Sequence, residues 1–204
     1  MGEAEFGFAE YETFNDFFTR RLKKGLRPIE SPLDRRVMCS PSDGTIFATG
    51  KVDSAHSLID CVKGHSYRLD EYLFGVIGDE ENKFEDWEKL SLKPNNNTDL
   101  NRLLQQIKAR GNSLYYTGIY LAPTNYHRFH APCAHNLHFS RHIAGYLYLV
   151  RPSYVEKHVE TFRQSERVNT FGQWNNDLFL CVSYVGALGV GSIALNHDRG
   201  LETN

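Results

Sequence analysis

The chain has 204 residues, of which 41% are hydrophobic and 13% aromatic, and its formal net charge is −2. This composition is typical of a globular protein with a substantial core, and it excludes an intrinsically disordered chain. The near-neutral charge gives no overall field that would attract nucleic acid, so no nucleic-acid partner is expected. The sequence contains no run of 18 apolar residues and predicts no membrane-spanning helix.

The first predicted element is an amphipathic helix over about residues 11–24. Its apolar face is formed by Tyr11, Phe14, Phe17, Phe18 and Leu22. Thr13 and Asp16 have the spacing of a capping box, and Gly25 is the expected stop. Five basic residues gather near the end of this segment: Arg20, Arg21, Lys23, Lys24 and Arg27. They form either the solvated end of the helix or an anchor for anionic phospholipid head groups, where each basic residue contributes about 1 kcal/mol.

Short strands and short helices follow along the rest of the chain. Runs of high β propensity, punctuated by glycine and proline, predict strands within 37–67, 113–123, 137–150 and 177–198. Helices are predicted over 66–75, over 99–111 and from Ser153 into the segment 153–168. The polar segment 78–98 is predicted to be an exposed insertion. The sequence therefore predicts one α+β domain over residues 1–204, with an antiparallel β-sheet core and flanking helices.

The four cysteines are Cys39, Cys61, Cys133 and Cys181. They are widely spaced and form no Cys-x-x-Cys pair. This spacing favours buried free thiols over a disulfide framework or a zinc knuckle.

The stretch TNYHRFHAPC, residues 124–133, holds His127 and His130, and five of the nine histidines fall between residues 127 and 142. Together with Cys133 these two histidines are of the types that bind metals. The spacing disfavours a metal site, because the segment follows a predicted strand and contains Pro132, and no second ligand pair stands out. The stretch alone leaves surface histidines and acid–base groups as the other interpretations.

The turn sequence SPSDGTI, residues 40–46, places Asp43 just before a predicted strand. Its carboxylate either closes a local turn or is held rigidly enough to orient an imidazole. Glycines also recur at 186, 189 and 191, but no Lys-Ser or Lys-Thr follows them as a phosphate-binding loop requires. These glycines are expected to allow close backbone packing beside an active site.

Taken in order, several motifs make the chain resemble the phosphatidylserine decarboxylase family, closest to its eukaryotic mitochondrial branch. They are FNDFFTRRLKKGLRPI, SPSDGTI, VKGHSYRLDEYL, YLAPTNYHRFHAPC, SERV, VGALGVGSI and DRGLETN. The resemblance implies conversion of phosphatidylserine to phosphatidylethanolamine and CO₂ through a Schiff base with a pyruvoyl cofactor. That cofactor is self-generated from a serine in a Leu-Gly-Ser-Thr segment, which splits the chain into β and α parts.

The resemblance also implies roles for three residues. A serine hydroxyl is a weak nucleophile that needs a base, and the base needs a group to orient it. His130 would be this base and Asp43 its orienter. His127 would serve the later decarboxylation by donating a proton to the carbanion, a task that suits an imidazole. No residue is expected to hold a metal.

The sequence departs from the family pattern because it contains no Leu-Gly-Ser-Thr. Gly191-Ser192 is followed by Ile193, and it is not assigned as the pyruvoyl precursor. The chain is therefore expected to be a β-chain part whose sheet is incomplete at the C-terminus, and to be inactive and prone to aggregation alone. Expected partners are the α chain, a second copy in a homodimer, and the mitochondrial inner membrane at its surface, although no targeting segment is visible.

Two other functions remain open at this stage. One is a lipid-binding or regulatory relative that has lost the nucleophile. The other is a zinc-dependent hydrolase that uses the histidine cluster.

Overall fold

The computed structural model describes residues 2–53, 58–62, 65–75, 97–158, 160–175 and 178–203. In chain order its elements are η1 (Phe8–Glu10), α1 (Phe14–Phe18), β1 (Thr45–Val52), β2 (Leu58–Val62), β3 (His65–Arg68), α2 (Leu69–Phe74), α3 (Asn97–Ala109), β4 (Leu114–Tyr120), β5 (His135–Ile143), α4 (Pro152–Val155), α5 (Thr161–Gln164), β6 (Arg167–Trp174) and β7 (Leu178–Val185). The named strands pair antiparallel throughout, which confirms the predicted α+β class with an antiparallel sheet core.

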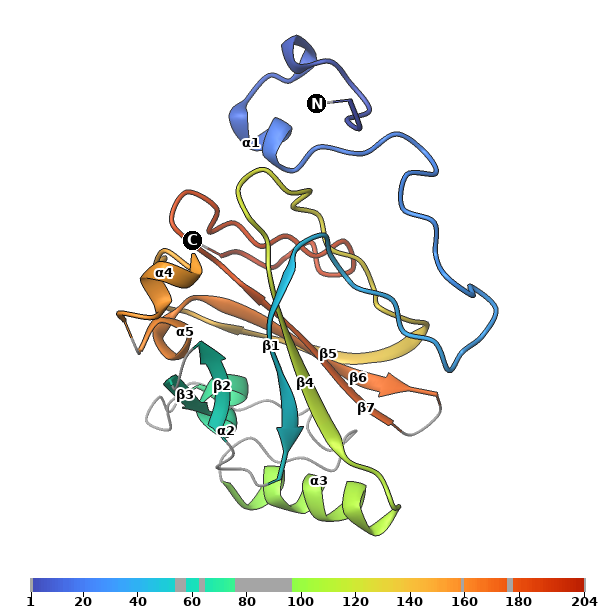
Figure 1. Ribbon diagram of the computed structural model, residues 1–204, viewed down its shortest axis with the longest axis vertical. Coiled ribbons are helices and arrows are strands. Elements are labelled where there is room, and N and C mark those ends of the chain that lie inside the picture. Colours follow the sequence, from blue (N-terminus) through green and yellow to red (C-terminus); the bar gives the residue numbers. More distant parts are fainter. Residues whose placement is uncertain are drawn as a thin grey trace.

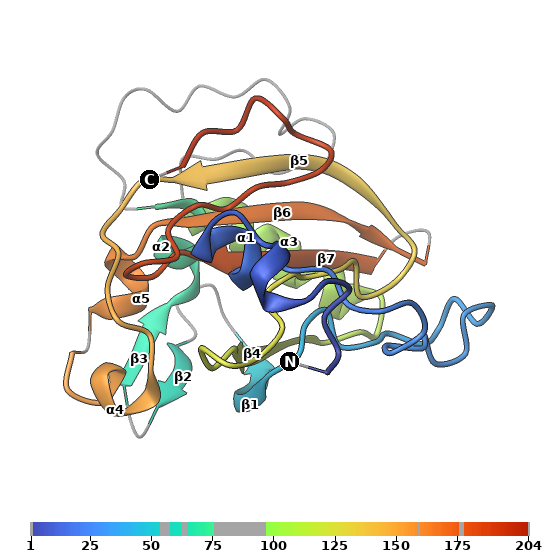
Figure 2. The same cartoon turned by 90° about the horizontal axis from the view of Figure 1, so that it is seen from above.

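The strands form three small sheets. β1 pairs with β4, β2 pairs with β3, and β6 lies between β5 and β7 in a three-stranded sheet. Figure 1 shows α3 at one end of the strands and the N-terminal segment at the opposite end. Seen from above in Figure 2, the N-terminal segment lies over the end where the loop after β4 turns back. This end of the sheets carries the predicted site residues.

The main core lies where α2 and α3 pack on the sheets. Its buried members are Val52, Leu69, Leu73, Leu100, Leu103, Leu104 and Phe171. Three leucines of α3 recur at the spacing of one helix face, so that face is driven into the core. Phe171 is fully buried and stacks on Phe139 with ring centroids 4.7 Å apart. Burial of each large apolar side chain stabilises the fold by about 1.5–3 kcal/mol.

The predicted N-terminal helix over residues 11–24 is wrong in extent, because α1 covers only Phe14–Phe18. The predicted capping box is present: the Asp16 N–H donates to Thr13 Oγ1 and the Thr13 N–H donates to Asp16 Oδ2, each over 3.1 Å. At the other end, the Thr19 hydroxyl donates back to the carbonyl of Asn15 over 2.8 Å. Such side-chain bonds compete with helix continuation.

After α1 the chain pairs with its own N-terminus. The Glu5 N–H donates to the Arg21 carbonyl over 2.9 Å, and the Lys23 N–H donates to the Glu3 carbonyl over 2.8 Å. Leu22, expected on the apolar helix face, instead forms an isolated antiparallel bridge with Ala4. These tertiary bonds replace the intrahelical bonds that the amphipathic pattern predicted.

Other boundaries differ from the prediction. The segment 153–168 does not continue as one helix: α4 begins at Pro152 after the N-cap residue Arg151, and α5 begins at Thr161. The Thr161 hydroxyl donates to the His158 carbonyl over 2.7 Å, which interrupts the helix at this point. The helix predicted over 66–75 is shorter, since β3 extends to Arg68 and α2 follows.

The described sheets contain one strand that the sequence did not predict, β6. The run 137–150 yields only β5, and the run 177–198 yields only β7, followed by turns. The helix expected over 99–111 is present as α3. The insertion predicted over 78–98 lies outside the described residues, apart from its last two, which open α3.

Two predictions about residue classes can be compared with the described residues. Cys39, Cys133 and Cys181 are free thiols, as expected, but each is half-buried and not fully buried as the sequence predicted. Cys61 lies in a strand whose side chains are not described. Among the described residues, no helix has the length and apolar character needed to cross a membrane.

Candidate active site

The turn that carries Asp43 and the loop that carries His130 are held together by two backbone bonds. The Cys39 N–H donates to the Pro132 carbonyl, and the His130 N–H donates to the Pro41 carbonyl, each over 2.7 Å. Because proline has no N–H, neither proline returns a bond to its partner. This short pairing brings the residues before β1 alongside the loop after β4.

Gly44 lets the Asp43 turn approach β4 closely. A Cβ atom at this position would lie 2.5 Å from the carbonyl oxygen of Tyr120. A larger residue would therefore push the turn away from the strand. The predicted turn before a strand is confirmed, since β1 begins at Thr45 and pairs with Tyr120.

Asp43 forms a two-point hydrogen-bonded pair with Arg27, a residue of the basic cluster. The Arg27 Nε donates to Asp43 Oδ1 over 2.8 Å, and its Nη2 donates to Asp43 Oδ2. The same guanidinium bonds Glu3, with Nη1 3.1 Å from Oε1 and Nη2 3.0 Å from Oε2. The hydrogen bond from Arg27 holds the pKa of Asp43 below its usual range, and attraction to His130 adds to this effect. Asp43 is therefore a fixed carboxylate at neutral pH.

His130 bonds a buried phenol. Its Nε2 lies 3.0 Å from Tyr126 Oη, and the two rings lie 5.7 Å apart between centroids. Burial raises the pKa of Tyr126, so its hydroxyl keeps its proton. Depending on the imidazole tautomer, the phenolic oxygen accepts from Nε2–H, which leaves Nδ1 able to take up a proton, or the hydroxyl donates to Nε2. The described structure contains no hydrogen bond between Asp43 and His130, so the orienting role of Asp43 stays a prediction.

Tyr126 is a site residue that the sequence interpretation missed. Its signal was present, because it precedes His130 by four residues in the same histidine-rich stretch.

His127 lies under an aromatic ring of the N-terminal segment. The Phe18 ring lies over the imidazole, with centroids 3.8 Å apart. The imidazole Nδ1 lies 2.9 Å from the Asn125 carbonyl, which only accepts, so Nδ1 carries the hydrogen of the neutral ring. Burial lowers the pKa of His127, and the neutral form is favoured with Nε2 as the site of proton uptake.

Phe129, which directly precedes His130, anchors the loop to the sheet. Phe129 stacks on Tyr184 of β7 with ring centroids 3.9 Å apart. Both rings pack against Val168, Ile193 and Leu195. The loop is therefore fixed to the three-stranded sheet by Phe129, while the neighbouring imidazoles bond their own loop.

The glycine-rich segment after β7 packs closely, as the sequence predicted. A Cβ atom on Gly186 would lie 3.3 Å from the Gly191 carbonyl oxygen. The Thr203 hydroxyl accepts a bond from the Ile193 N–H over 2.8 Å and donates to the Gly191 carbonyl over 3.3 Å. Ser192 is exposed between these contacts.

The basic cluster divides into two groups. Arg20 donates to the Thr124 and Asn125 carbonyls, each over 3.4 Å, and so fastens the N-terminal segment to the histidine loop. Lys23 donates through Nζ to the Gly2 carbonyl over 2.9 Å. The Arg21 and Lys24 side chains are exposed and bond no residue that the structure describes. Part of the cluster is therefore internal structure and part remains available to a partner.

The histidines between residues 127 and 142 bond different groups. His135 Nδ1 lies 3.0 Å from the Cys133 carbonyl, and His142 Nε2 lies 3.0 Å from Glu166 Oε1. Within the described ranges, no group of three or more His, Cys, Asp or Glu residues is placed to hold a metal ion.

Comparison with known proteins places this site in context. A family model described as phosphatidylserine decarboxylase matches residues 14–204. The mitochondrial phosphatidylserine decarboxylase proenzyme of Cricetulus griseus is 36% identical over 95% of this chain and 44% of its own length. Proenzyme 1 of Arabidopsis thaliana is 34% identical over 100% of the chain and 47% of its own length. The Campylobacter jejuni proenzyme is 30% identical over 96% of the chain and 61% of its own length. The chain thus spans about half the length of the curated relatives it matches.

Proposed function

Because this chain belongs to the phosphatidylserine decarboxylase family, we propose that it forms the β part of an enzyme that converts phosphatidylserine to phosphatidylethanolamine and CO₂. The observation that carries the proposal is the loop 124–130, which presents two imidazoles in different environments. His130 bonds a buried phenol, and His127 is half-buried beneath Phe18. Two histidines with different hydrogen-bond partners and surroundings suit two separate proton transfers.

His130 is proposed as the base that activates the serine in self-cleavage. A neutral imidazole takes the hydroxyl proton, and the serine oxygen then attacks the preceding carbonyl. For this role Nε2 carries the hydrogen and donates to Tyr126 Oη, so that Nδ1 takes the serine proton. The bond to Tyr126 fixes the ring plane and thereby supports a defined direction for the transfer. The carboxylate of Asp43, held ionised by Arg27, is proposed to orient the imidazole and to stabilise its charged form.

His127 is proposed to handle the proton of the decarboxylation step. The lowered pKa makes its protonated form a stronger acid than a free imidazole, which suits donation to a carbanion. Its Nδ1 bond to the Asn125 carbonyl leaves Nε2 as the atom that gains and loses this proton.

The family's pyruvoyl group supplies the electron sink for the bond that releases CO₂. The donor set of this chain fits such a self-made cofactor, because it offers a base, an ionised carboxylate and a protonated phenol within one loop system. The proposal includes an α chain that carries the pyruvoyl group, a homodimer, and a peripheral place at the mitochondrial inner membrane. The mitochondrial names of several relatives support the location.

Self-cleavage and turnover test these roles separately. The chain is prepared in the longest form that its gene encodes, and cleavage is followed on a denaturing gel. We expect His130→Ala and Asp43→Asn to block cleavage. His127→Ala should cleave normally but release CO₂ from phosphatidylserine at least a hundredfold more slowly, since general acid–base catalysis contributes about 10²–10⁴-fold. His135→Ala serves as the control histidine. Normal cleavage by His130→Ala would remove the proposed base.

A further inference from the structure

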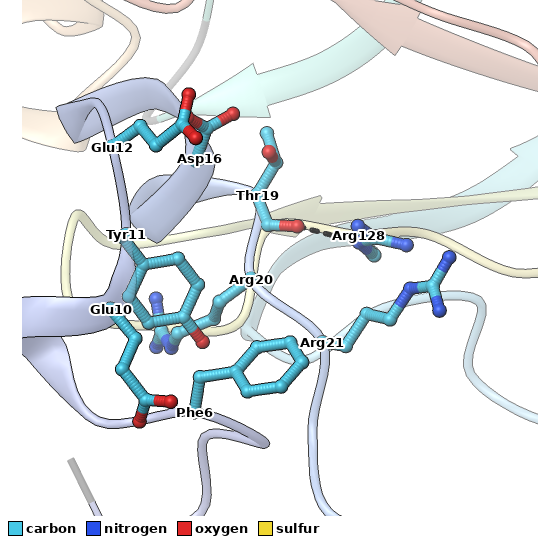
Figure 3. A pocket seen from close by; sticks show the side chains of 9 residues that line it. All are labelled: Phe6, Glu10, Tyr11, Glu12, Asp16, Thr19, Arg20, Arg21 and Arg128. Carbon is cyan, nitrogen blue, oxygen red and sulfur yellow. Dashed lines mark hydrogen bonds between the residues drawn. The ribbon is translucent and has the colours of Figure 1, made fainter.

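An open pocket lies between the N-terminal segment and the loop that carries His127 and His130. Both segments line it, with side chains that include Phe6, Tyr11, Glu12, Asp16, Arg21 and Arg128. Figure 3 shows the Arg21 and Arg128 side chains reaching out on one side of the pocket, while those of Glu12 and Asp16 are grouped at another. The pocket therefore presents cationic and anionic groups at separate places.

Two arginines of this pocket keep donors available for a ligand. Arg128 donates through Nε to the Thr19 carbonyl over 2.6 Å, which fixes the guanidinium and leaves its Nη groups for other acceptors. Arg21 is exposed, and its side chain bonds no described residue. Arg20 differs, because its Nη groups already donate to backbone carbonyls. A pair of guanidiniums suits the oxygens of a phosphate ester, which they bind through paired N–H donors.

The carboxylates limit which phosphate ester fits. Glu12 bonds no described residue, and Asp16 uses Oδ2 to cap α1. Carboxylates accept bonds from a primary ammonium, whereas they repel a dianion such as free phosphate. The pocket is thus suited to a ligand that carries one phosphate charge and one ammonium.

The N-terminal segment that lines the pocket also carries exposed aromatic rings. Phe6, Phe8 and Phe14 on the N-terminal segment are 51%, 58% and 71% exposed, and Phe6 also lines the pocket. Exposed rings gathered beside basic residues are typical of surfaces that contact a bilayer. These exposed rings favour a lipid-borne phosphate over a soluble one.

We propose that this pocket binds the head group of an aminophospholipid, with its phosphodiester on Arg21 and Arg128 and its primary ammonium on Glu12 and Asp16. The inference deepens the proposed action at a membrane surface and rests on it. Because Arg128 directly follows His127, a lipid bound here places the bilayer next to the catalytic loop.

Vesicle binding tests the pocket without any turnover. The chain, in the longest form that its gene encodes, is sedimented with vesicles of phosphatidylcholine alone or with added phosphatidylethanolamine. The two vesicles carry the same net charge, but choline has no N–H to donate. We expect at least fivefold tighter binding to the phosphatidylethanolamine vesicles. Glu12→Gln should abolish most of this preference, because it weakens the acceptor that distinguishes a primary ammonium from choline. Arg21→Gln should weaken binding to both kinds of vesicle, and because neither side chain bonds a described residue, the fold should be unaffected. Lys24→Gln, an equal charge loss outside the pocket, should change binding less than twofold.

Competition separates the possible sources of the phosphate. Soluble glycerophosphoethanolamine should displace the protein from vesicles, while inorganic phosphate at the same concentration should not. Equal displacement by both would overturn the head-group assignment in favour of a phosphate-only site. Equal weakening by Arg21→Gln and Lys24→Gln would overturn the pocket and indicate diffuse charge attraction. If the wild type binds neither kind of vesicle, the proposed membrane action itself fails and the pocket inference fails with it.

Discussion

The phenolic oxygen of Tyr126 lies 3.0 Å from Nε2 of His130, and the hydroxyl is buried with the ring. This bond occupies Nε2 of His130 and leaves Nδ1 as the ring nitrogen available for a further contact. Arg27 occupies the carboxylate that was expected to orient His130. In this arrangement the imidazole is bonded to a phenol, and the orienting role of Asp43 stays a prediction.

Tyr126→Phe removes this bond while keeping the ring. We expect self-cleavage to slow about five- to tenfold, because a neutral hydrogen bond contributes about 1 kcal/mol. The rate is measured on a gel as the fraction cleaved against time. Tyr115→Phe is the control, since this tyrosine of β4 is 67% exposed. An unchanged rate in Tyr126→Phe would show that the phenol does not position the base.

Phe18 is expected to control the protonation of His127. Burial favours the neutral imidazole and lowers the pKa of His127 from its ordinary value of 6.5. Phe18→Leu uncovers the ring and should move this pKa upward, which a titration of the imidazole signals by NMR will measure. The same substitution at Phe14, which is exposed, should leave the pKa unchanged. A downward or absent shift in Phe18→Leu would contradict burial as the cause.

The same pKa shift has a consequence for stability. The unfolded chain takes up a proton on this imidazole at a higher pH than the folded chain does. Acidification below about pH 6.5 therefore lowers the free energy of unfolding through His127.

Arg27 should stabilise the N-terminal segment in a pH-dependent way. The pKa of Asp43 is below the unfolded value of 3.8, so its contribution is present above about pH 4 and is lost as the pH falls further. Arg27→Gln should lower the free energy of unfolding at pH 7 by about 1 kcal/mol or less, since partly exposed ion pairs are weak. The difference from wild type should shrink toward zero by about pH 2.5 in urea titrations.

The control for this effect is Arg36→Gln. Arg36 pairs with Asp34, only two residues away, so the pair constrains little of the chain. Its loss should be smaller than that of Arg27→Gln at pH 7. A pH-independent effect of Arg27→Gln would mean that the arginine acts by packing and not through Asp43.

The spacing of hydrophobic residues in the sequence predicted those helices and strands that bury one face and expose the other. The leucines of α3 and the alternating residues of β4 are of this kind. The sequence did not predict β6, because the first six residues of this strand are all buried, including the polar residues Arg167, Asn169 and Thr170. A strand buried on both faces has no alternation. The side chains of Arg167 and Asn169 also donate to backbone carbonyls of α2, which a local pattern does not show.

The site residues divide in a similar way. His127, His130 and Asp43 could be found from their residue types and neighbouring turns. The hydrogen bonds from Arg27 to Asp43 join residues 16 positions apart in the sequence. The contact of Phe18 with His127 joins two segments that are distant in the sequence. Both depend on how the N-terminal segment folds back, and the amphipathic pattern had assigned that segment to one helix.

The buried Arg167 should be the strongest stability determinant outside the apolar core. Its Nε donates to the Tyr72 carbonyl over 2.7 Å, and its Nη1 donates to the Ser165 carbonyl over 2.7 Å. These bonds join β6 to α2 and to the end of α5. Arg167→Met keeps the length of the side chain but leaves buried carbonyls with fewer donors, at an expected cost of about 2–4 kcal/mol in the free energy of unfolding.

Urea denaturation measures this loss. Arg102→Met is the control, because Arg102 lies on the exposed face of α3 and should change the free energy of unfolding by less than about 0.5 kcal/mol. If Arg167→Met were as stable as wild type, the guanidinium would be replaceable by apolar packing, as happens for some buried charges. The bonds to α2 would then serve to fix the position of β6 relative to the helix, and a loss of self-cleavage without a loss of stability would reveal that role.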